Sequence, residues 1–156
     1  VNMLTKPNVE ELYETLDAEI LSGAENLLNP IEKYLIGAML PHEALNYFER
    51  NTLLVVPSNR EGIVMTALCG SLLKQNVGYN ISGIIFCGAI PPHPKILDLI
   101  KLTNIPVLLV QEDSFSIATK LNQLLVKVRS GESDKIEKIQ NLTEKYVDID
   151  AICELL

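Results

Sequence analysis

Thr52-Leu53-Leu54-Val55-Val56 decides the fold, because this run of β-branched and aliphatic residues lacks the polar alternation of a half-exposed strand. A continuous apolar run of this length is typical of a strand buried on both faces of a parallel sheet. Two similar runs follow, ISGIIF at residues 81–86 and PVLLV at residues 106–110. Turn-forming residues follow the first run at Pro57-Ser58-Asn59 and the second at Cys87-Gly88-Ala89. The sequence therefore predicts a sheet built around three buried strands.

Segments with helical periodicity separate these strands, which is the order expected of β-α-β units. We expect helices over residues 60–73, 94–102 and 114–128, and one or two helical turns over residues 41–48. A further strand is predicted at residues 34–38. The sequence therefore predicts the α/β class, as a three-layer α/β/α domain with a mainly parallel sheet.

The domain division is expected near residue 130. Residues 1–130 form the predicted α/β domain, in which residues 1–30 contribute a helix capped by Asn8 and a short strand at Ile20-Leu21. Residues 131–156 are predicted to form a charged helix and a linker toward a downstream domain. The chain starts without a methionine and stops at Leu155-Leu156, so we expect a piece of a longer protein.

Composition argues against several classes of partner and site. The 156 residues carry a formal charge of −7 and no basic patch, and aromatic residues make up 5%, which disfavours nucleic acid. The apolar runs are far shorter than the roughly 18 residues of a membrane span, and no signal peptide precedes them. Three cysteines without metal-type spacing favour the reducing cytoplasm, and the separation of His42 from His93 disfavours a metal site.

Ligands of open α/β sheets bind beyond the carboxyl ends of the strands, where loops and helix N-termini meet. If the three buried strands are neighbours, the loops that follow them share one edge of the sheet. These loops supply the candidate ligand-binding residues, which are Asn59, Arg60, Glu61, Cys87, Gly88, Ala89, Asp113 and Ser114.

Each loop offers a distinct chemical group. We expect Ser58 or Asn59 to cap the next helix, whose N–H groups favour an anion. Arg60 offers a fork for carboxylate or phosphate, and the alternatives are a surface ion pair or a pair with Glu112 or Asp113 across the crevice. Gly88 permits a positive φ or close approach of a ligand, and Asp113 or Ser114 can cap the following helix.

The residues do not form a complete catalytic set. Cys87 is predicted to be an inert, small apolar residue, with a nucleophile as the alternative. His93 lies in Pro91-Pro92-His93-Pro94, where turn geometry is a better explanation than catalysis. The sequence contains no phosphate-binding P-loop, no nucleophile elbow and no zinc-protease motif. We therefore predict no catalytic residues, metal ligands or cofactor, and favour a binding or regulatory module.

Nearly the whole chain resembles the DRTGG domain. The resemblance rests on residues 36–68, 82–100 and 105–121, and on Pro7–Leu12 with Ile20–Gly23. It implies the middle region of long bacterial phosphate acetyltransferases, between a P-loop domain similar to dethiobiotin synthetase and the catalytic domain. DRTGG domains also accompany CBS domains and occur in stand-alone P-loop proteins similar to cobyrinic acid diamide synthases.

The motif that names the family is partly kept. Its Asp-Arg corresponds to Asn59-Arg60, and its Thr-Gly-Gly corresponds to Cys87-Gly88-Ala89, so Arg60 and Gly88 match. The carboxylate, the hydroxyl and the last glycine of the motif are replaced here.

The resemblance implies regulation or assembly rather than acetyl transfer. The first hypothesis is a non-catalytic regulatory domain of a phosphate acetyltransferase, which converts acetyl-CoA and phosphate to acetyl phosphate and CoA, and which senses a small anionic metabolite or nucleotide. Alternatives are a dimerisation module without a ligand, a regulatory part of a stand-alone P-loop or CBS-domain protein, and an enzyme that uses Cys87. The expected partners are a second copy and the flanking domains.

Overall fold

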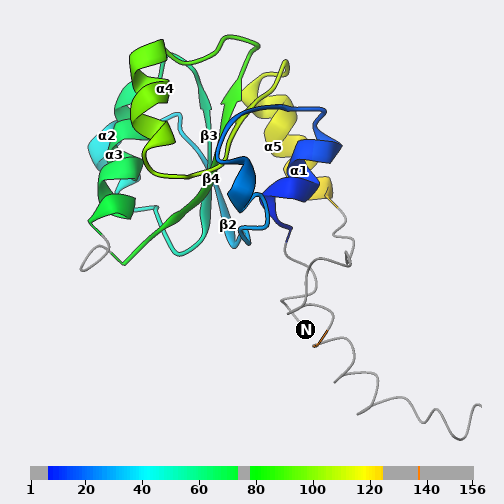
Figure 1. Ribbon diagram of the computed structural model, residues 1–156, viewed down its shortest axis with the longest axis horizontal. Coiled ribbons are helices and arrows are strands. Elements are labelled where there is room, and N and C mark those ends of the chain that lie inside the picture. Colours follow the sequence, from blue (N-terminus) through cyan, green and yellow to red (C-terminus); the bar gives the residue numbers. More distant parts are fainter. Residues whose placement is uncertain (1–6, 74–77, 125–136, 138–156) are drawn as a thin grey trace, which may run out of the picture. The chain divides into compact units, whose positions relative to one another are not determined.

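A five-stranded sheet forms the centre of the computed structural model, which describes residues 7–73, 78–124 and Glu137 (Figure 1). The strands are β1 (Glu19–Ser22), β2 (Lys33–Ile36), β3 (Thr52–Pro57), β4 (Ile81–Cys87) and β5 (Val107–Leu109). The helices are α1 (Val9–Thr15), α2 (Pro41–Ala44), α3 (Glu61–Leu72), α4 (Pro94–Lys101) and α5 (Ser114–Gln123), with a short 3-10 helix η2 (Ala24–Asn26).

The sheet is mainly parallel, as predicted. Its strand order is β1-β5-β4-β3-β2, in which β2 through β5 are parallel and β1 pairs antiparallel with β5. The three apolar runs of the sequence are the adjacent strands β3, β4 and β5. These strands are buried along almost their whole length, which explains why their sequences show no polar alternation.

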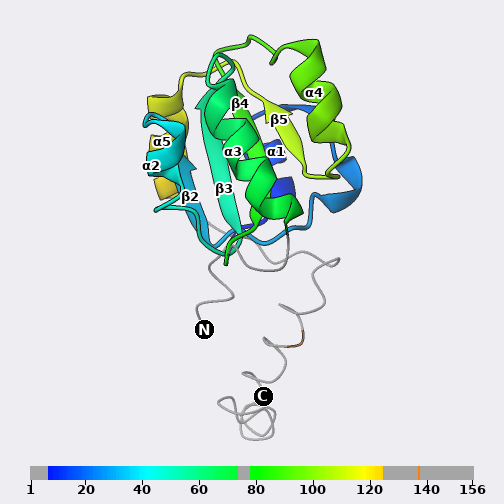
Figure 2. The same ribbon diagram turned by 90° about the vertical axis from the view of Figure 1, so that its left-hand side faces the viewer.

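Helices cover both faces of the sheet, which confirms the predicted three layers. Helices α2, α3 and α4 lie on one face, and α1 and α5 lie on the other (Figures 1 and 2). Successive residues of β3 point to opposite faces, so Leu54 and Val56 pack under α3 while Leu53 and Val55 pack under α1 and α5. Burial on both faces leaves the ends of the strands as the exposed parts of the central sheet.

Several element boundaries differ from those predicted. Helix α5 ends at Gln123 rather than at residue 128, because Leu124 adopts an extended backbone, and residues 125–128 lie outside the described residues. Helix α2 spans four residues, and β2 ends at Ile36. Helix α1 begins as predicted, with a capping box between Asn8 and Glu11. The division at residue 130 and the charged helix and linker predicted for residues 131–156 lie outside the described residues, apart from Glu137.

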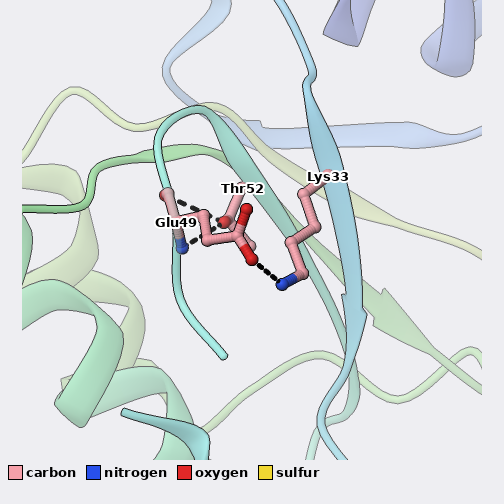
Figure 3. A network of polar contacts seen from close by, with 3 residues as sticks. All are labelled: Lys33, Glu49 and Thr52. Carbon is pink, nitrogen blue, oxygen red and sulfur yellow. Dashed lines mark hydrogen bonds and ion pairs between the residues drawn. The ribbon is translucent and has the colours of Figure 1, made fainter. Parts of the chain in front are cut away.

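Polar contacts fix the amino ends of the central strands. The ammonium group of Lys33 forms an ion pair with Glu49, and the Thr52 hydroxyl donates to the Glu49 carbonyl at 2.9 Å (Figure 3). The side-chain amide of Asn80 donates to Asn51 Oδ1 at 2.8 Å, while the Asn51 N–H donates to Asn80 Oδ1 at 2.9 Å. These contacts join the starts of β2, β3 and β4.

Replacing Gly37 by alanine tests the packing of α3 on the sheet. A Cβ at Gly37 would overlap Cγ1 of the fully buried Val56. We expect Gly37→Ala to lower the free energy of unfolding by about 1–3 kcal/mol in urea titrations, as overpacked core positions do. The neighbouring, exposed Ala38→Ser is the control and should change stability by less than about 0.5 kcal/mol. An unchanged free energy of unfolding in Gly37→Ala would show that the Val56 side chain moves aside without energetic cost.

Candidate functional site

The loops after β3, β4 and β5 meet at one edge of the sheet. The Ser58 hydroxyl donates to the carbonyl of Ile90, and so joins the first loop to the second. The second loop is joined to the third because the Gly88 N–H donates to the Glu112 carbonyl and the Ala89 N–H donates to the Val110 carbonyl, both at 2.9 Å. We call residues 58–61, 87–90 and 112–114 the rim. The common edge expected from the sequence therefore exists.

Helix α3 starts without a side-chain cap. Its N-cap residue is Arg60, whose side chain makes no capping hydrogen bond, so the expectation that Ser58 or Asn59 caps this helix is wrong. The physical reason is that the Ser58 hydroxyl donates to the Ile90 carbonyl, while the exposed Asn59 lies inside the turn that the Arg60 N–H closes on the Pro57 carbonyl at 3.0 Å. Among the residues that the structure describes, no side chain therefore caps the first N–H groups of α3.

The guanidinium group of Arg60 is exposed and forms no ion pair with any residue that the structure describes. The expectation that Glu112 or Asp113 pairs with Arg60 is wrong. Glu112 instead forms an ion pair with Lys120 at 2.7 Å, across two turns of α5. The positive charge of Arg60 therefore faces solvent at the β3 side of the rim.

Asp113 is the N-cap of α5, as expected. Its Oδ1 accepts from the Ser116 N–H at 2.9 Å, and its Oδ2 accepts from the Ser116 hydroxyl at 3.2 Å. The hydrogen bond from the Ser116 N–H is the main reason that the pKa of Asp113 lies below its usual range. Because Asp113 is ionised at neutral pH, the β5 side of the rim carries negative charge, opposite in sign to the Arg60 side.

Burial makes the Cys87 thiol unreactive. Cys87 ends β4, is 4% exposed, and packs with apolar residues below α5. Burial raises the pKa of Cys87 to about 11, with further contributions from the charges of Asp113 and Glu112. A catalytic thiol needs a lowered pKa, so the structure supports the inert role and argues against the nucleophile.

The remaining candidates lie at ordinary structural positions. Glu61 begins α3 and is half-buried, and Ser114 begins α5 and is also half-buried. The ring of His93 caps α4 by accepting the Lys95 N–H at 3.2 Å, which confirms the structural explanation of that histidine. Sequence reasoning missed Phe115, which is 81% exposed in the first turn of α5. The sequence did contain a signal for this exposure, because Phe115 lies off the apolar stripe of the helix.

A family model for the DRTGG domain matches residues 11–124, which run from within α1 to the residue after α5 and include all of the rim. The chain belongs to the DRTGG domain family. The resemblance drawn from the sequence is confirmed.

Known relatives of this DRTGG domain are longer proteins. Phosphate acetyltransferases from Nitratidesulfovibrio vulgaris and Synechocystis are each 28% identical to it, over 93% and 94% of the chain. The enzyme of the same name from Pseudomonas aeruginosa is 22% identical over 94% of the chain. The chain spans about a fifth of the length of these relatives (21% of each).

A solved structure supports the fold. The CBS and DRTGG domains of the regulatory region of Clostridium perfringens pyrophosphatase, complexed with the activator diadenosine tetraphosphate, superpose with a TM-score of 0.58. The match has 17% sequence identity and covers 89% of this chain and 60% of the other. At this identity the likeness concerns the fold. Among the helices that the structure describes, none is long and apolar enough to cross a membrane.

The backbone of the turn after β4 explains what the change from glycine to Ala89 costs in this DRTGG domain. Gly88 has φ +87°, and a Cβ built there would meet no atom within 4 Å, so the backbone faces open space. Ala89 follows with φ +62°, in the left-handed region where a side chain is strained. The family's glycine at this position is therefore the residue that the turn favours, and Ala89 holds the same turn at a cost.

Exchanging Ala89 for glycine tests this strain. We expect Ala89→Gly to raise the free energy of unfolding by about 1 kcal/mol, because glycine adopts positive φ without steric cost. Gly88→Ala should lower it by a similar amount or more. Chemical denaturation measures the free energy of unfolding of both variants. The exposed Ala38, which has ordinary φ, is the control, and glycine there should not stabilise the domain. A loss of stability in Ala89→Gly would contradict the strain.

Thiol labelling tests the burial of Cys87. With Cys153 changed to serine, we expect one thiol, the exposed Cys69, to react with an aromatic disulfide reagent in the native domain and two in denaturant. The rise in pKa from 9.0 to about 11 lowers the thiolate fraction of Cys87 about a hundredfold near neutral pH. Cys87→Ala should leave the native count unchanged. Two fast native thiols would contradict the structure.

Proposed function

We propose that this DRTGG domain is a non-catalytic regulatory part of a phosphate acetyltransferase. The support is its similarity, over nearly its whole length, to one segment of proteins with that name. In this proposal, the remaining four-fifths of such a protein carries out the acetyl transfer between CoA and phosphate. The domain senses a small anionic metabolite or nucleotide at the rim, and its partners include the flanking domains in the cytoplasm.

The observation that carries the sensing proposal is the free charge of Arg60 beside the uncapped start of α3. Arginine presents a planar fork that matches carboxylate and phosphate oxygens. The N–H groups in the first turn of a helix attract an anion through the same partial charge that a capping side chain would satisfy. Both features lie at the β3 side of the rim, and no carboxylate among the described residues neutralises the arginine.

The polarity of the rim narrows the kind of ligand. Asp113 and Glu112 lie close enough to Cys87 to raise the pKa of its thiol, so their negative field covers the β4 and β5 side. A ligand composed only of anionic groups would be repelled there. A ligand that fits the rim has its anionic group at Arg60 and hydrogen-bond donors toward Asp113. A nucleotide, with phosphate at one end and hydroxyl or amino groups at the other, has this arrangement.

The pyrophosphatase regulatory region gives independent support for a nucleotide. That region shares this fold and was solved with diadenosine tetraphosphate as its activator. In this proposal, binding at the rim of the present domain biases the activity of the protein to which it is joined, as an effector does in any two-state system.

Assembly is the second candidate function. Large apolar side chains with about half of their surface exposed gather around α2, at Leu40, Leu45 and Tyr47. Such side chains favour association with another protein surface, and a second copy of the domain is the partner that the assembly candidate names.

A thermal-shift screen tests sensing at the rim. The full chain is heated with adenine and guanine nucleotides, NADH, pyruvate and acetyl phosphate in turn. A ligand at a hundred times its Kd stabilises the native state by about 2.7 kcal/mol, which raises the Tm by roughly 5–10 °C in a domain of this size. We expect Arg60→Ala to abolish the shift caused by the active compound.

Arg50→Ala is the matched control, because Arg50 is also an exposed arginine but precedes β3 at the opposite edge of the sheet. Its shift should equal that of the unchanged chain. An equal shift in Arg60→Ala would move the site away from the rim, and no shift with any compound would leave assembly as the better proposal.

A further inference from the structure

The outer side of β2 carries backbone hydrogen-bonding groups that pair with no other strand of the described sheet. Strand β2 is the last strand of the sheet, with β3 as its neighbour. The Lys33 N–H donates to the Asn51 carbonyl and the Gly37 N–H donates to the Val55 carbonyl, so alternate residues of the strand face β3. Tyr34 and Ile36 lie between them and turn their N–H groups away from the sheet. Apart from the pairing with β3, no described residue accepts either N–H group, while the Ile36 carbonyl on the same side accepts the Ala38 N–H at 2.8 Å and keeps one lone pair for a further donor.

The usual protections of an edge strand are weak in β2. Proteins guard open edges with bulges and with charged side chains, above all lysine. Strand β1, at the other edge, begins with Glu19 and has an irregular register between Ile20 and Ser22. Strand β2 pairs regularly, and its charged residue, Lys33, is held by Glu49 (Figure 3). The edge of β2 is therefore open to another strand.

An apolar surface of balanced charge adjoins this edge. Helix α2 covers the β2 side of the sheet, while α4 covers the β5 side (Figure 2). Around α2, Leu40 is 53%, Leu45 47% and Tyr47 50% exposed. Residues 33–50 contain two basic side chains, Lys33 and Arg50, and two acidic ones, Glu43 and Glu49, so their formal charge is zero in a chain of −7. The local charges therefore oppose a second copy less than the net charge of the whole chain would.

We propose that β2 pairs antiparallel with β2 of a second copy and that the two α2 surfaces close over the joint. This proposal deepens the assembly candidate by naming its surface. A twofold axis perpendicular to the sheet, midway between the two β2 strands and level with Leu35, places Tyr34 of each copy opposite Ile36 of the other, so the outward backbone groups meet. The same axis keeps both α2 helices on one face of a continuous sheet, where Leu45 and Tyr47 of the two copies approach each other.

The size of the surface sets the expected strength. Three side chains at about half exposure contribute on the order of 300 Å² per copy, against roughly 800 Å² per partner in a stable complex. The strand joint adds hydrogen bonds but little apolar area. A reversible dimer with a Kd in the micromolar range is therefore expected, rather than an obligate one.

Sedimentation velocity of the full chain, from about 1 μM to about 1 mM, tests the dimer. We expect the weight-average mass to rise with concentration toward that of two chains. Leu45→Lys should raise the dimer Kd at least tenfold, because it places a charge at the twofold joint. Ile36→Pro should do the same, because proline removes an outward N–H that the fold itself does not use.

Leu102→Lys is the matched control. Leu102 is 79% exposed at the end of α4, on the other side of the domain. The dimer Kd of Leu102→Lys should therefore stay within twofold of that of the unchanged chain. Circular dichroism verifies folding, and if Ile36→Pro fails to fold, Leu45→Lys decides. A monomer at every concentration, or a dimer unaffected by Leu45→Lys, overturns the proposal. Ligand shifts at the rim are measured separately, so sensing and assembly fail or stand independently.

Discussion

The structure depends on burying β3 and β4 on both faces. Neither strand has a polar side that could face water, so helices must cover both faces of the sheet. A helix that covers the sheet and connects one strand to the next returns the chain to the same end of the sheet, which makes the two strands parallel. Parallel strands deliver all of their following loops to one edge. The position of the rim is thus a consequence of apolar burial many residues away, and the chemistry of the rim varies without disturbing the sheet.

This separation explains how the family motif changes in this chain while the fold is kept. The thiol of Cys87 points into the apolar layer under α5, where a small side chain suffices. Ala89 accepts a left-handed backbone that glycine would adopt at no cost. Arg60 and Gly88, which the chain retains, face solvent, and so do Asn59 and Ala89, where the motif is changed.

Sequence reasoning succeeded where a single physical rule dominates. Continuous apolar runs placed β3, β4 and β5, and the capping preferences of Asn8 and Asp113 placed the starts of α1 and α5. It failed where tertiary contacts compete for a group. The Ser58 hydroxyl had two acceptable uses, and only the path of the loop across the sheet decides between the cap and the Ile90 carbonyl. The partner of Glu112 was missed because Lys120, eight residues along the chain, reaches it.

The hydrogen bonds that join the three loops have a mechanical consequence. Ser58 is hydrogen-bonded to Ile90. Gly88 and Ala89 are hydrogen-bonded to the loop after β5 and to its first residue, so the three loops of the rim are connected to one another. Displacing one of them strains the other two, and substitutions in different loops should therefore show energies that do not simply add. An unbroken series of hydrogen bonds thus leads from the end of β3, through the turn after β4, to the residue before the N-cap of α5.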